Sequence, residues 1–253
     1  MREVLVDITD RIMTIVINRP EARNAVTMAV SVACAEALDE LDARDDLAVG
    51  VITGADGNFC AGMDLKGFLR GERPSLPGRG FAGLTRRPPA KPLIAAVEGY
   101  ALAGGCEVVL ACDMVTAGRG AKLGIPEVKR GLIAAAGGLF RLPQKIPANV
   151  AMQLALTGDL LDAERAHQLG LVNVLTEDGG ALDAAHELAS KVAANGPLAT
   201  LASKRVITES RGWPADDLWG RQAKIVEPVF ASEDAKEGAR AFAEKRVPEW
   251  QGR

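Results

Sequence analysis

The sequence predicts an α/β fold in which buried parallel strands alternate with helices. Two continuous apolar segments, Ala48 to Thr53 and Leu93 to Val97, have the length and composition of buried strands. The second is followed by a glycine-rich turn, a helical segment from Gly104 to about Cys112 and a third strand, Met114 to Ala117. Strand, turn, helix and strand with short connections is typical of parallel units whose helices cover the sheet.

A hairpin and an amphipathic helix are expected at the N-terminus. Val4 to Thr9 and Ile12 to Asn18 alternate apolar and polar residues around Asp10-Arg11, which indicates two paired strands rather than a signal peptide. Thr27 can then cap a helix whose apolar residues recur at spacings of three and four. The residues of this stripe are Val30, Ala33, Cys34, Ala37, Leu38 and Leu41.

The rest of the chain is expected to form a long loop and a helical second half. Residues 69 to 91 hold many Gly, Pro and Arg residues, which predicts a long, flexible surface loop of the kind that often serves as a lid. Pro214 suits the first turn of one later helix, and Ser232 can cap the last. The expected helices cover residues 148 to 156, 162 to 169, 180 to 194, 197 to 210, 215 to 230 and 233 to 246.

Composition narrows the class of protein. The chain has 253 residues, 48% of them hydrophobic, which suffices for a sizeable core in one domain or in one domain with an appendage. A count of 30 Lys and Arg against 33 Asp and Glu gives a net charge of -3, which offers no electrostatic footprint for nucleic acid. No apolar segment approaches the roughly 20 residues that cross a bilayer. We therefore expect a soluble protein with neither nucleic acid nor membrane as a partner.

Several common site motifs are missing from the sequence. The four cysteines form no CxxC pair and no metal-ligand spacing, so they are expected to be small buried hydrophobic residues in a reducing cytoplasm. His167 and His186 lie in helical segments where a surface or packing role is the ordinary one. No GxSxG elbow, Walker loop or GxGxxG fingerprint is present, which removes the usual signals for serine hydrolases and nucleotide-binding proteins.

Glu107 places a carboxylate inside an apolar segment, GYALAGGCEVVLACD at 99 to 113. The helix that opens at Gly104-Gly105 begins with backbone N–H groups that lack partners and carry partial positive charge, which suits a developing oxyanion. The two glycines let a ligand approach closely. A carboxylate one turn into this helix would reach the same ligand, although the pattern also fits a Glu on a solvated helix face.

Glu127 and Met63 complete the candidate site. Glu127 follows the third strand in LGIPE and is by itself an ordinary loop acid. Two carboxylates in one apolar site raise each other's pKa and can hold a water, removing one proton and returning another, which is hydration chemistry. The turn NFCAGMDLK at 58 to 66 either aims the Met63 N–H at the oxygen served by Gly104 or is a plain strand-to-helix turn. Metal ligation by the two Glu residues is a weaker alternative without a nearby His.

Three segments together resemble the crotonase superfamily, the enoyl-CoA hydratases and isomerases. They are FCAGMDLK at 59 to 66, KPLIAAVEGYALAGGCEVVLACD at 91 to 113 and LGIPEVKRGL at 123 to 132. The likeness extends over nearly the whole chain, from INRPEARNAV near the start to SEDAKEGARAFAEKR near the end. It implies a crotonase-like spiral of ββα units with the active site over residues 1 to 195. The C-terminal helical region, 196 to 253, would serve oligomerisation and close the CoA site.

The resemblance also implies roles for the candidate residues. The oxygen of an acyl-CoA thioester would lie between the N–H groups of Met63 and Gly104, which form an oxyanion hole that stabilises an enolate. Glu107 and Glu127 match the two catalytic acids of the family. Glu107 would mainly activate water for attack at C3 and Glu127 would mainly exchange the proton at C2, although the pair can titrate as a unit. Coenzyme A is then part of the substrate, and neither a metal nor a separate cofactor is implied.

Contacts to CoA are implied at five positions of the first seventy residues. Arg23 and Ala25 match positions near the adenine, and Ala61, Leu65 and Lys66 match positions along the pantetheine and phosphates. The phosphates need cations, which a lysine in this group can supply.

Two positions near the C-terminus are implied to act across a subunit boundary. Phe242 and Lys245 match residues that in relatives reach the CoA of a neighbouring subunit. The resemblance accordingly implies a homotrimer or a dimer of trimers, with Lys245 as a further cation for the phosphates.

Residues 134 to 140 depart from the usual hydratase pattern. Relatives often carry Pro-Gly-Ala-Gly-Gly followed by Thr-Gln, whereas this chain has Ala-Ala-Ala-Gly-Gly-Leu-Phe. Ala135 thus places a methyl beside the expected water and makes the wall more apolar. GFAGLT at 80 to 85 and the C-terminal segment at 232 to 253 look like the carnitinyl-CoA dehydratase branch, whose substrate bears a quaternary ammonium. With only 10 aromatic residues in the chain, no cage for such a cation can be identified.

An enoyl-CoA hydratase, or a dehydratase in the reverse direction, is the predicted function. The presence of both Glu residues favours hydro-lyase chemistry. A Δ3,Δ2-enoyl-CoA isomerase that uses Glu127 alone, a carnitinyl-CoA-type dehydratase and a non-catalytic acyl-CoA binding protein are the alternatives.

Overall fold

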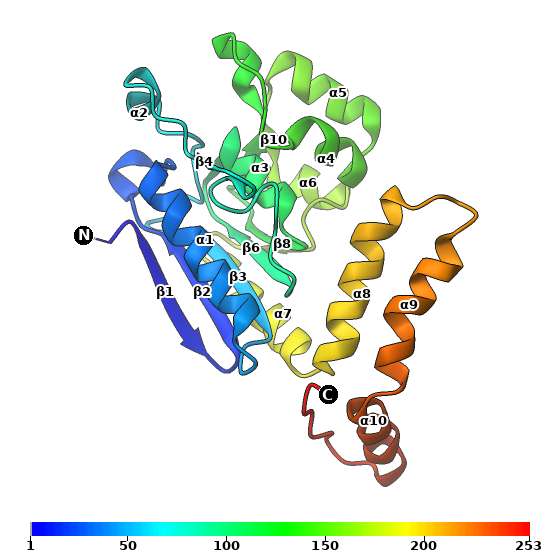
Figure 1. The fold of residues 1–253 in the computed structure, drawn as a ribbon. Helices are drawn as coiled ribbons and strands as arrows, with labels where there is room; N and C mark the ends of the chain where they lie inside the picture. The colour runs from blue at the N-terminus through cyan, green and yellow to red at the C-terminus, as the bar shows by residue number, and fades with distance from the viewer. Residues whose placement is uncertain (1) are drawn as a thin grey trace.

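A six-stranded sheet forms the centre of the molecule in the computed structural model, which describes residues 2–253 (Figure 1). Its strand order is β1-β2-β3-β6-β8-β11; β1 is antiparallel to β2, and the remaining neighbours are parallel. The predicted hairpin and parallel α/β units are thereby confirmed. The strands are β1 Val4–Thr9, β2 Ile12–Ile17, β3 Val49–Gly54, β6 Leu93–Val97, β8 Met114–Gly118 and β11 Val174–Thr176.

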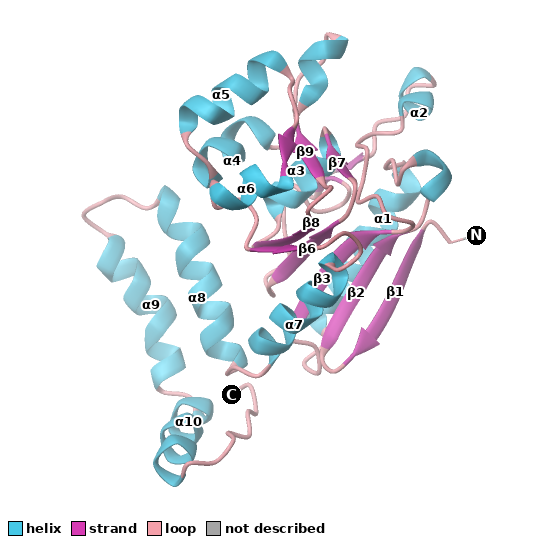
Figure 2. Cartoon of the chain, turned by 180° about the vertical axis from the view of Figure 1, so that it is seen from behind, coloured by secondary structure: helices cyan, strands magenta, loops and turns pink. Residues whose placement is uncertain are grey.

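Helices α1 (Met28–Ala43) and α7 (Ala181–Ala193) cover opposite faces of this sheet, as the two views show (Figures 1 and 2). Successive residues of a strand point to opposite faces, so Val51 belongs to the buried cluster under α7 and Ile52 to the cluster under α1. The predicted helix cap is confirmed, because the Thr27 hydroxyl accepts the Val30 N–H at 3.2 Å. Every residue of the predicted α1 stripe is buried or packed against the core.

A smaller layer beside the main sheet carries most of the candidate site. It combines a three-stranded sheet of order β10-β9-β7 with a group of short helices. Its strands are β7 Tyr100–Leu102, β9 Lys122–Gly124 and β10 Leu161–Asp162. Its helices are α3 Gly104–Ala111, α4 Gly138–Lys145, α5 Ala148–Thr157 and α6 Ala163–Gln168, with a 3₁₀ turn at Pro126–Arg130. The predicted helix at Gly104 is confirmed as α3.

Two short elements border this layer, and two 3₁₀ turns occur elsewhere. Helix α2 spans Leu65–Leu69, and β4 (Ser75–Leu76) pairs antiparallel with β5 (Gly80–Phe81). The 3₁₀ turns are Pro20–Ala22 and Ser210–Gly212.

The prediction that all of residues 69 to 91 form a surface loop is wrong, because 80–85 are buried. The apolar residues of that segment, not its glycines, decide where it lies.

Three C-terminal helices project away from the two sheets (Figures 1 and 2). They are α8 Pro197–Glu209, α9 Leu218–Phe230 and α10 Glu233–Glu244. Neither α8 nor α9 has a buried residue, and Trp219 is 82% exposed. Ser232 caps α10 as predicted, accepting the Ala235 N–H at 3.0 Å. The prediction that Pro214 lies in the first turn of a helix is wrong, because α9 begins four residues later.

No helix among residues 2–253 combines the length and the apolar character that crossing a membrane demands.

The four cysteines are buried and unpaired, as predicted from their spacing. They lie at positions 34, 60, 106 and 112, on α1, on the turn before α2, and within and just after α3. Burial raises the pKa of each thiol to about 12, because a thiolate would lose its hydration there. The thiols therefore stay protonated and pack as apolar groups.

Candidate active site

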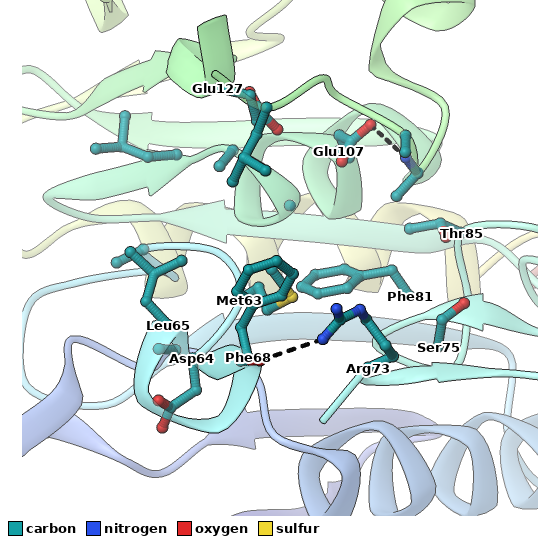
Figure 3. Close-up of a pocket in the computed structure, with 18 of the residues that line it drawn as sticks. Met63, Asp64, Leu65, Phe68, Arg73, Ser75, Phe81, Thr85, Glu107 and Glu127 are labelled. Carbon is teal, nitrogen blue, oxygen red and sulfur yellow. Dashed lines mark hydrogen bonds between the residues drawn. The ribbon is translucent and has the colours of Figure 1, made fainter. Parts of the chain in front are cut away.

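A cavity of about 1460 Å³ lies between the small layer and the segment that carries α2, β4 and β5 (Figure 3). The four residues predicted for acid–base chemistry and the oxyanion line it, namely Met63, Gly104, Glu107 and Glu127. The five predicted CoA contacts of the N-terminal part line it too, namely Arg23, Ala25, Ala61, Leu65 and Lys66. Sites for drug-sized ligands occupy roughly 300–1,000 Å³, so this cavity has room for a larger ligand.

The two predicted C-terminal contacts lie elsewhere within the chain. Phe242 is on α10 and is 87% exposed, and Lys245 follows that helix directly. Neither residue lines the cavity formed by the rest of the chain.

Glu107 is held in place by two backbone N–H groups. It lies one turn into α3 and is 3% exposed, so the alternative of a solvated helix face is wrong. Its Oε1 accepts the N–H of Ala136 at 2.7 Å and that of Gly138 at 2.8 Å. A Cβ at Gly138 would lie 3.1 Å from the same oxygen, so a glycine here lets the N–H approach. One carboxylate oxygen is thereby occupied.

Glu127 faces the same cavity from the 3₁₀ turn after β9 (Figure 3). Its Oε2 is buried and has no hydrogen-bond partner among residues 2–253. Burial raises the pKa of this carboxyl group, and nearby Arg130 opposes the rise. An unpartnered buried carboxyl oxygen at a cavity wall is suited to take or give a proton.

The charge of Glu127 affects the ionisation of Glu107. Burial raises the pKa of Glu107 to about 7; the two N–H donors oppose this rise, and the charge of Glu127 adds to it. Burial raises the pKa of Glu127 as well. The pair can therefore retain a proton near neutral pH.

Replacing Glu107 with Gln should stabilise the fold at alkaline pH. Ionising Glu107 in its buried site costs stability that is absent below pH 4.5, grows as pH rises to about 7 and is complete above it. The Gln variant avoids this cost and can still accept both N–H groups, so we expect it to gain up to about 3 kcal/mol at pH 8. Urea unfolding at pH 8 and at pH 4.5 measures the difference. A Gln variant less stable than the native chain at pH 8 would contradict this account.

Two backbone donors line the same cavity as these acids. The N–H groups of Met63 and Gly104 have no hydrogen-bond partner among the described residues 2–253. The parallel bridge between Cys60 and Ala101 aligns their two segments side by side. A Cβ at Gly62 would lie 3.3 Å from the Gly104 nitrogen, which shows how closely the segments approach. Two unpartnered N–H groups lining one cavity can bind an oxyanion.

Charged groups at the α2 end of the cavity form a network that the sequence pattern did not reveal. Arg19 pairs with Glu3 at 3.3 Å and with Asp64 at 3.0 Å. Asp64 also caps α2, accepting the Gly67 N–H at 3.1 Å and the Lys66 N–H at 2.9 Å. Its pKa is lowered by the Gly67 N–H, by Arg19 and by the Lys66 N–H. Asp64 is therefore committed to the structure of α2.

The histidines have packing partners remote from the cavity, as predicted. Thr14 Oγ1 lies 2.9 Å from His186 Nε2, and His167 Nδ1 lies 2.9 Å from the Val172 carbonyl oxygen. Among residues 2–253, no group of three or more His, Cys, Asp or Glu side chains is placed to hold a metal ion.

Sequence reasoning missed the residues that anchor Glu107. The sequence marks Ala136 and Gly138 only as part of a segment that departs from the usual hydratase pattern, yet their N–H groups hold the carboxylate. Arg141 was also missed; its guanidinium donates to the Thr85 carbonyl at 2.6 Å and to the Ala136 carbonyl at 3.3 Å. Consecutive glycines before a helix were the available signal, since they permit backbone to approach a buried acceptor.

Comparison with known proteins gives matches over almost the full chain. A family model described as enoyl-CoA hydratase/isomerase matches residues 7–253. Enoyl-CoA hydratase EchA19 of Mycobacterium tuberculosis is 41% identical over 262 residues, covering 99% of this chain and 97% of that protein. Carnitinyl-CoA dehydratase of Salmonella agona is 40% identical over 253 residues, covering 96% and 95%. The crystal structure of an enoyl-CoA hydratase from M. tuberculosis H37Rv matches with a TM-score of 0.98 and 62% identity, covering 100% of both chains.

Proposed function

The chain belongs to the enoyl-CoA hydratase/isomerase family, and we propose that it adds water across the 2,3 double bond of an acyl-CoA thioester, or catalyses the reverse dehydration, using Glu107 and Glu127. One observation carries this proposal: the buried Glu107 and the half-buried Glu127, both with raised pKa values, line the same cavity as two unpartnered backbone N–H groups. Coenzyme A is part of the substrate in this scheme.

The thioester oxygen binds between the Met63 and Gly104 N–H groups. As water attacks C3, electron density moves through C2 onto this oxygen, and the two donors stabilise the resulting enolate. Each such donor contributes about 3 to 4 kcal/mol in comparable sites. The two N–H groups are already in place before the charge develops, so little reorganisation is needed.

The two acids divide the proton transfers. Ionised Glu107 takes one proton from the water as its oxygen bonds to C3, and protonated Glu127 gives its proton to C2. The product contains the elements of one water, and the pair ends with the proton on Glu107 instead of Glu127. Proton exchange with solvent restores the starting state, and dehydration follows the same steps in reverse.

The proposal is tested by the hydration of crotonyl-CoA, which is monitored as the loss of the enoyl thioester absorbance. The rate of this hydration should depend on pH in a defined way. The active state holds one proton on the pair, so activity falls when both groups are protonated and again when both are ionised. We expect a bell-shaped plot of kcat/KM with one limb near pH 7, the pKa of Glu107 in the free enzyme. Activity that stays constant from pH 5 to 9 would contradict the two-acid scheme.

The C-terminal helices serve assembly in this proposal. The exposed aromatic residues Trp219, Phe230 and Phe242 lie on α9 and α10, which have little contact with the body of the chain. Burying them between subunits of a trimer, or of a dimer of trimers, would cover this apolar surface. Phe242 and Lys245 would then approach the CoA of a neighbour. We assign residues 1 to 195 to the catalytic core and 196 to 253 to assembly, and we place the enzyme in the cytoplasm.

Residues that line the cavity argue against two of the alternatives. An isomerase that uses Glu127 alone leaves no role for the ordered, buried Glu107 carboxylate. A carnitinyl-CoA-type dehydratase must bind a quaternary ammonium, and the cavity wall carries Arg73, Arg86 and Arg141, which would repel it. A non-catalytic binder would bind acyl-CoA in a calorimeter and leave every enoyl-CoA unchanged.

A further inference from the structure

The cavity wall away from α2 carries positive charge that the proposed hydration does not use. If CoA lies along Leu65 and Lys66, the acyl chain points away from them. Figure 3 shows Leu65 on one side of the cavity, Ser75 and Thr85 on the other, and Arg73 reaching in between them. The inference that follows rests on the proposed function for this placement of the acyl chain.

Arg73 presents an unused pair of donors to the cavity. Its Nη1 donates to the carbonyl oxygens of Glu72 at 2.9 Å and Phe68 at 3.3 Å. Its Nε and Nη2 have no hydrogen-bond partner among residues 2–253. The guanidinium carbon lies 4.0 Å from the centre of the Phe68 ring, which orients the group. The free Nε and Nη2 edge matches the two oxygens of a carboxylate.

No carboxylate of the chain neutralises this guanidinium. Among residues 2–253, no acidic oxygen lies within 4.0 Å of Arg73, although acids are near it in sequence. The adjacent Glu72 accepts the Met28 N–H at 2.6 Å, and Asp64 is committed to Arg19 and to α2. Arg73 is exposed, so solvent can reach its free donors, and a ligand that brings an anion would supply the ionic partner that the chain does not.

A buried hydroxyl marks the same end of the cavity. Thr85 is 1% exposed and lines the cavity, and its Oγ1 has no hydrogen-bond partner among the described residues. A buried hydroxyl left without a partner costs free energy, so such groups are rare in native structures. Ser75 lines the cavity beside it. Ser75, Thr85 and the unpaired Arg73 guanidinium thus all line the part of the cavity away from Leu65 (Figure 3).

We propose that the acyl chain of the substrate ends in a carboxylate, which Arg73 binds through Nε and Nη2 with a further hydrogen bond from the Thr85 hydroxyl once rotation of that side chain brings its buried oxygen to the cavity. The substrate class is then the CoA esters of 2-enedioic acids. Arg86 and Arg141 also line the cavity and add long-range attraction, while Arg141 keeps its donors on the backbone. A terminal methyl would leave the guanidinium and the hydroxyl without partners, and a terminal ammonium would be repelled.

Matched substrates of equal carbon number test the proposal. We would compare glutaconyl-CoA with 2-pentenoyl-CoA, 2,3-dehydroadipyl-CoA with 2-hexenoyl-CoA, and 2-octenedioyl-CoA with 2-octenoyl-CoA. At the length that reaches Arg73, kcat/KM should favour the dioic ester by about 10 to 100-fold, the range for a hydrogen-bonded charge. Equal or better hydration of the monoacid at all three lengths overturns the proposal.

Variants at position 73 show whether this residue carries the preference. Arg73→Met should abolish the preference for the dioic ester. Arg73→Lys keeps the positive charge but loses the paired guanidinium donors, so it should retain only part of the preference. Thr85→Val removes the hydroxyl with little change in shape and should lower the preference several-fold. Arg70→Met is the matched control, because Arg70 is exposed like Arg73 but does not line the cavity. A preference that persists in Arg73→Met overturns the assignment.

Binding of saturated esters separates this inference from the proposed reaction. Adipyl-CoA and hexanoyl-CoA cannot be hydrated, so isothermal titration reports recognition alone. Tighter binding of adipyl-CoA that depends on Arg73, without hydration of any enoyl ester, would support the carboxylate site and refute the hydratase. Hydration without any dioic preference, with equal binding of the two esters, would support the hydratase and refute the carboxylate site.

Discussion

Replacing Glu107 with Gln should lower the rate of crotonyl-CoA hydration by about 10² or more, the ordinary contribution of a positioned acid–base group. The amide oxygen of Gln can still accept the N–H groups of Ala136 and Gly138, so the wall of the cavity stays in place. What is lost is the carboxylate that takes a proton from water. Stopped-flow or steady-state loss of the enoyl absorbance measures the effect in kcat.

The companion variant Glu127→Gln distinguishes a hydratase from a single-acid isomerase. Both Gln variants should lose hydration if each acid handles one proton. If Glu107→Gln instead retained the native hydration rate while Glu127→Gln lost it, Glu127 would act alone and the water-activating role of Glu107 would be wrong. Circular dichroism and CoA-ester binding of both variants serve as controls for folding and for the integrity of the cavity.

Gly62→Ala should lower kcat by about 10² to 10³, because it should displace the two backbone N–H groups that stabilise the oxyanion. Gly62 has φ +99, which an alanine adopts only with strain, and its Cβ would lie 3.0 Å from the Leu102 carbonyl and 3.3 Å from the Gly104 nitrogen. Relief of these contacts must separate the segments that carry the Met63 and Gly104 N–H groups. Infrared difference spectra should show a smaller shift of the bound thioester carbonyl, because its two donors no longer converge.

The control for backbone strain is Gly57→Ala. Gly57 also has positive φ, +73, yet a Cβ there would meet nothing within 4 Å. Both variants should lose about 1 to 3 kcal/mol of stability from the left-handed backbone, whereas only Gly62→Ala should change kcat and the carbonyl stretch. Equal kinetic losses in the two variants would show that strain, and not the position of the donors, explains the effect.

The strands and longer helices were predictable because their signals are local. The hairpin, β3, β6 and α3 follow from apolar periodicity bounded by glycines, and the caps at Thr27 and Ser232 follow from side-chain chemistry. Helix α4 was not predicted, because Pro143 lies inside it and removes one backbone donor from an eight-residue helix. Its stability comes from packing against α3 and α5, which no local pattern contains.

The candidate site was predictable in its chemistry and less so in its support. A carboxylate in an apolar segment after two glycines pointed to Glu107, but the N–H groups that hold it come from residues about thirty positions away. Arg73 illustrates the same limit. A segment rich in Gly, Pro and Arg indicates a solvated loop, and Arg73 is exposed as such a loop predicts, but no local pattern shows that it also lines a cavity.

The burial of the four cysteines has a consequence for an enzyme that handles 2-enoyl thioesters. Such esters are electrophiles at C3, and thiolates are the protein nucleophiles that alkylate most readily there. With a pKa of about 12, each thiol is ionised to a fraction on the order of 10⁻⁵ at pH 7. Cys106, directly beside Glu107 in α3, is 1% exposed. The packing that shapes the core therefore also protects the enzyme from covalent inactivation by the compounds it binds.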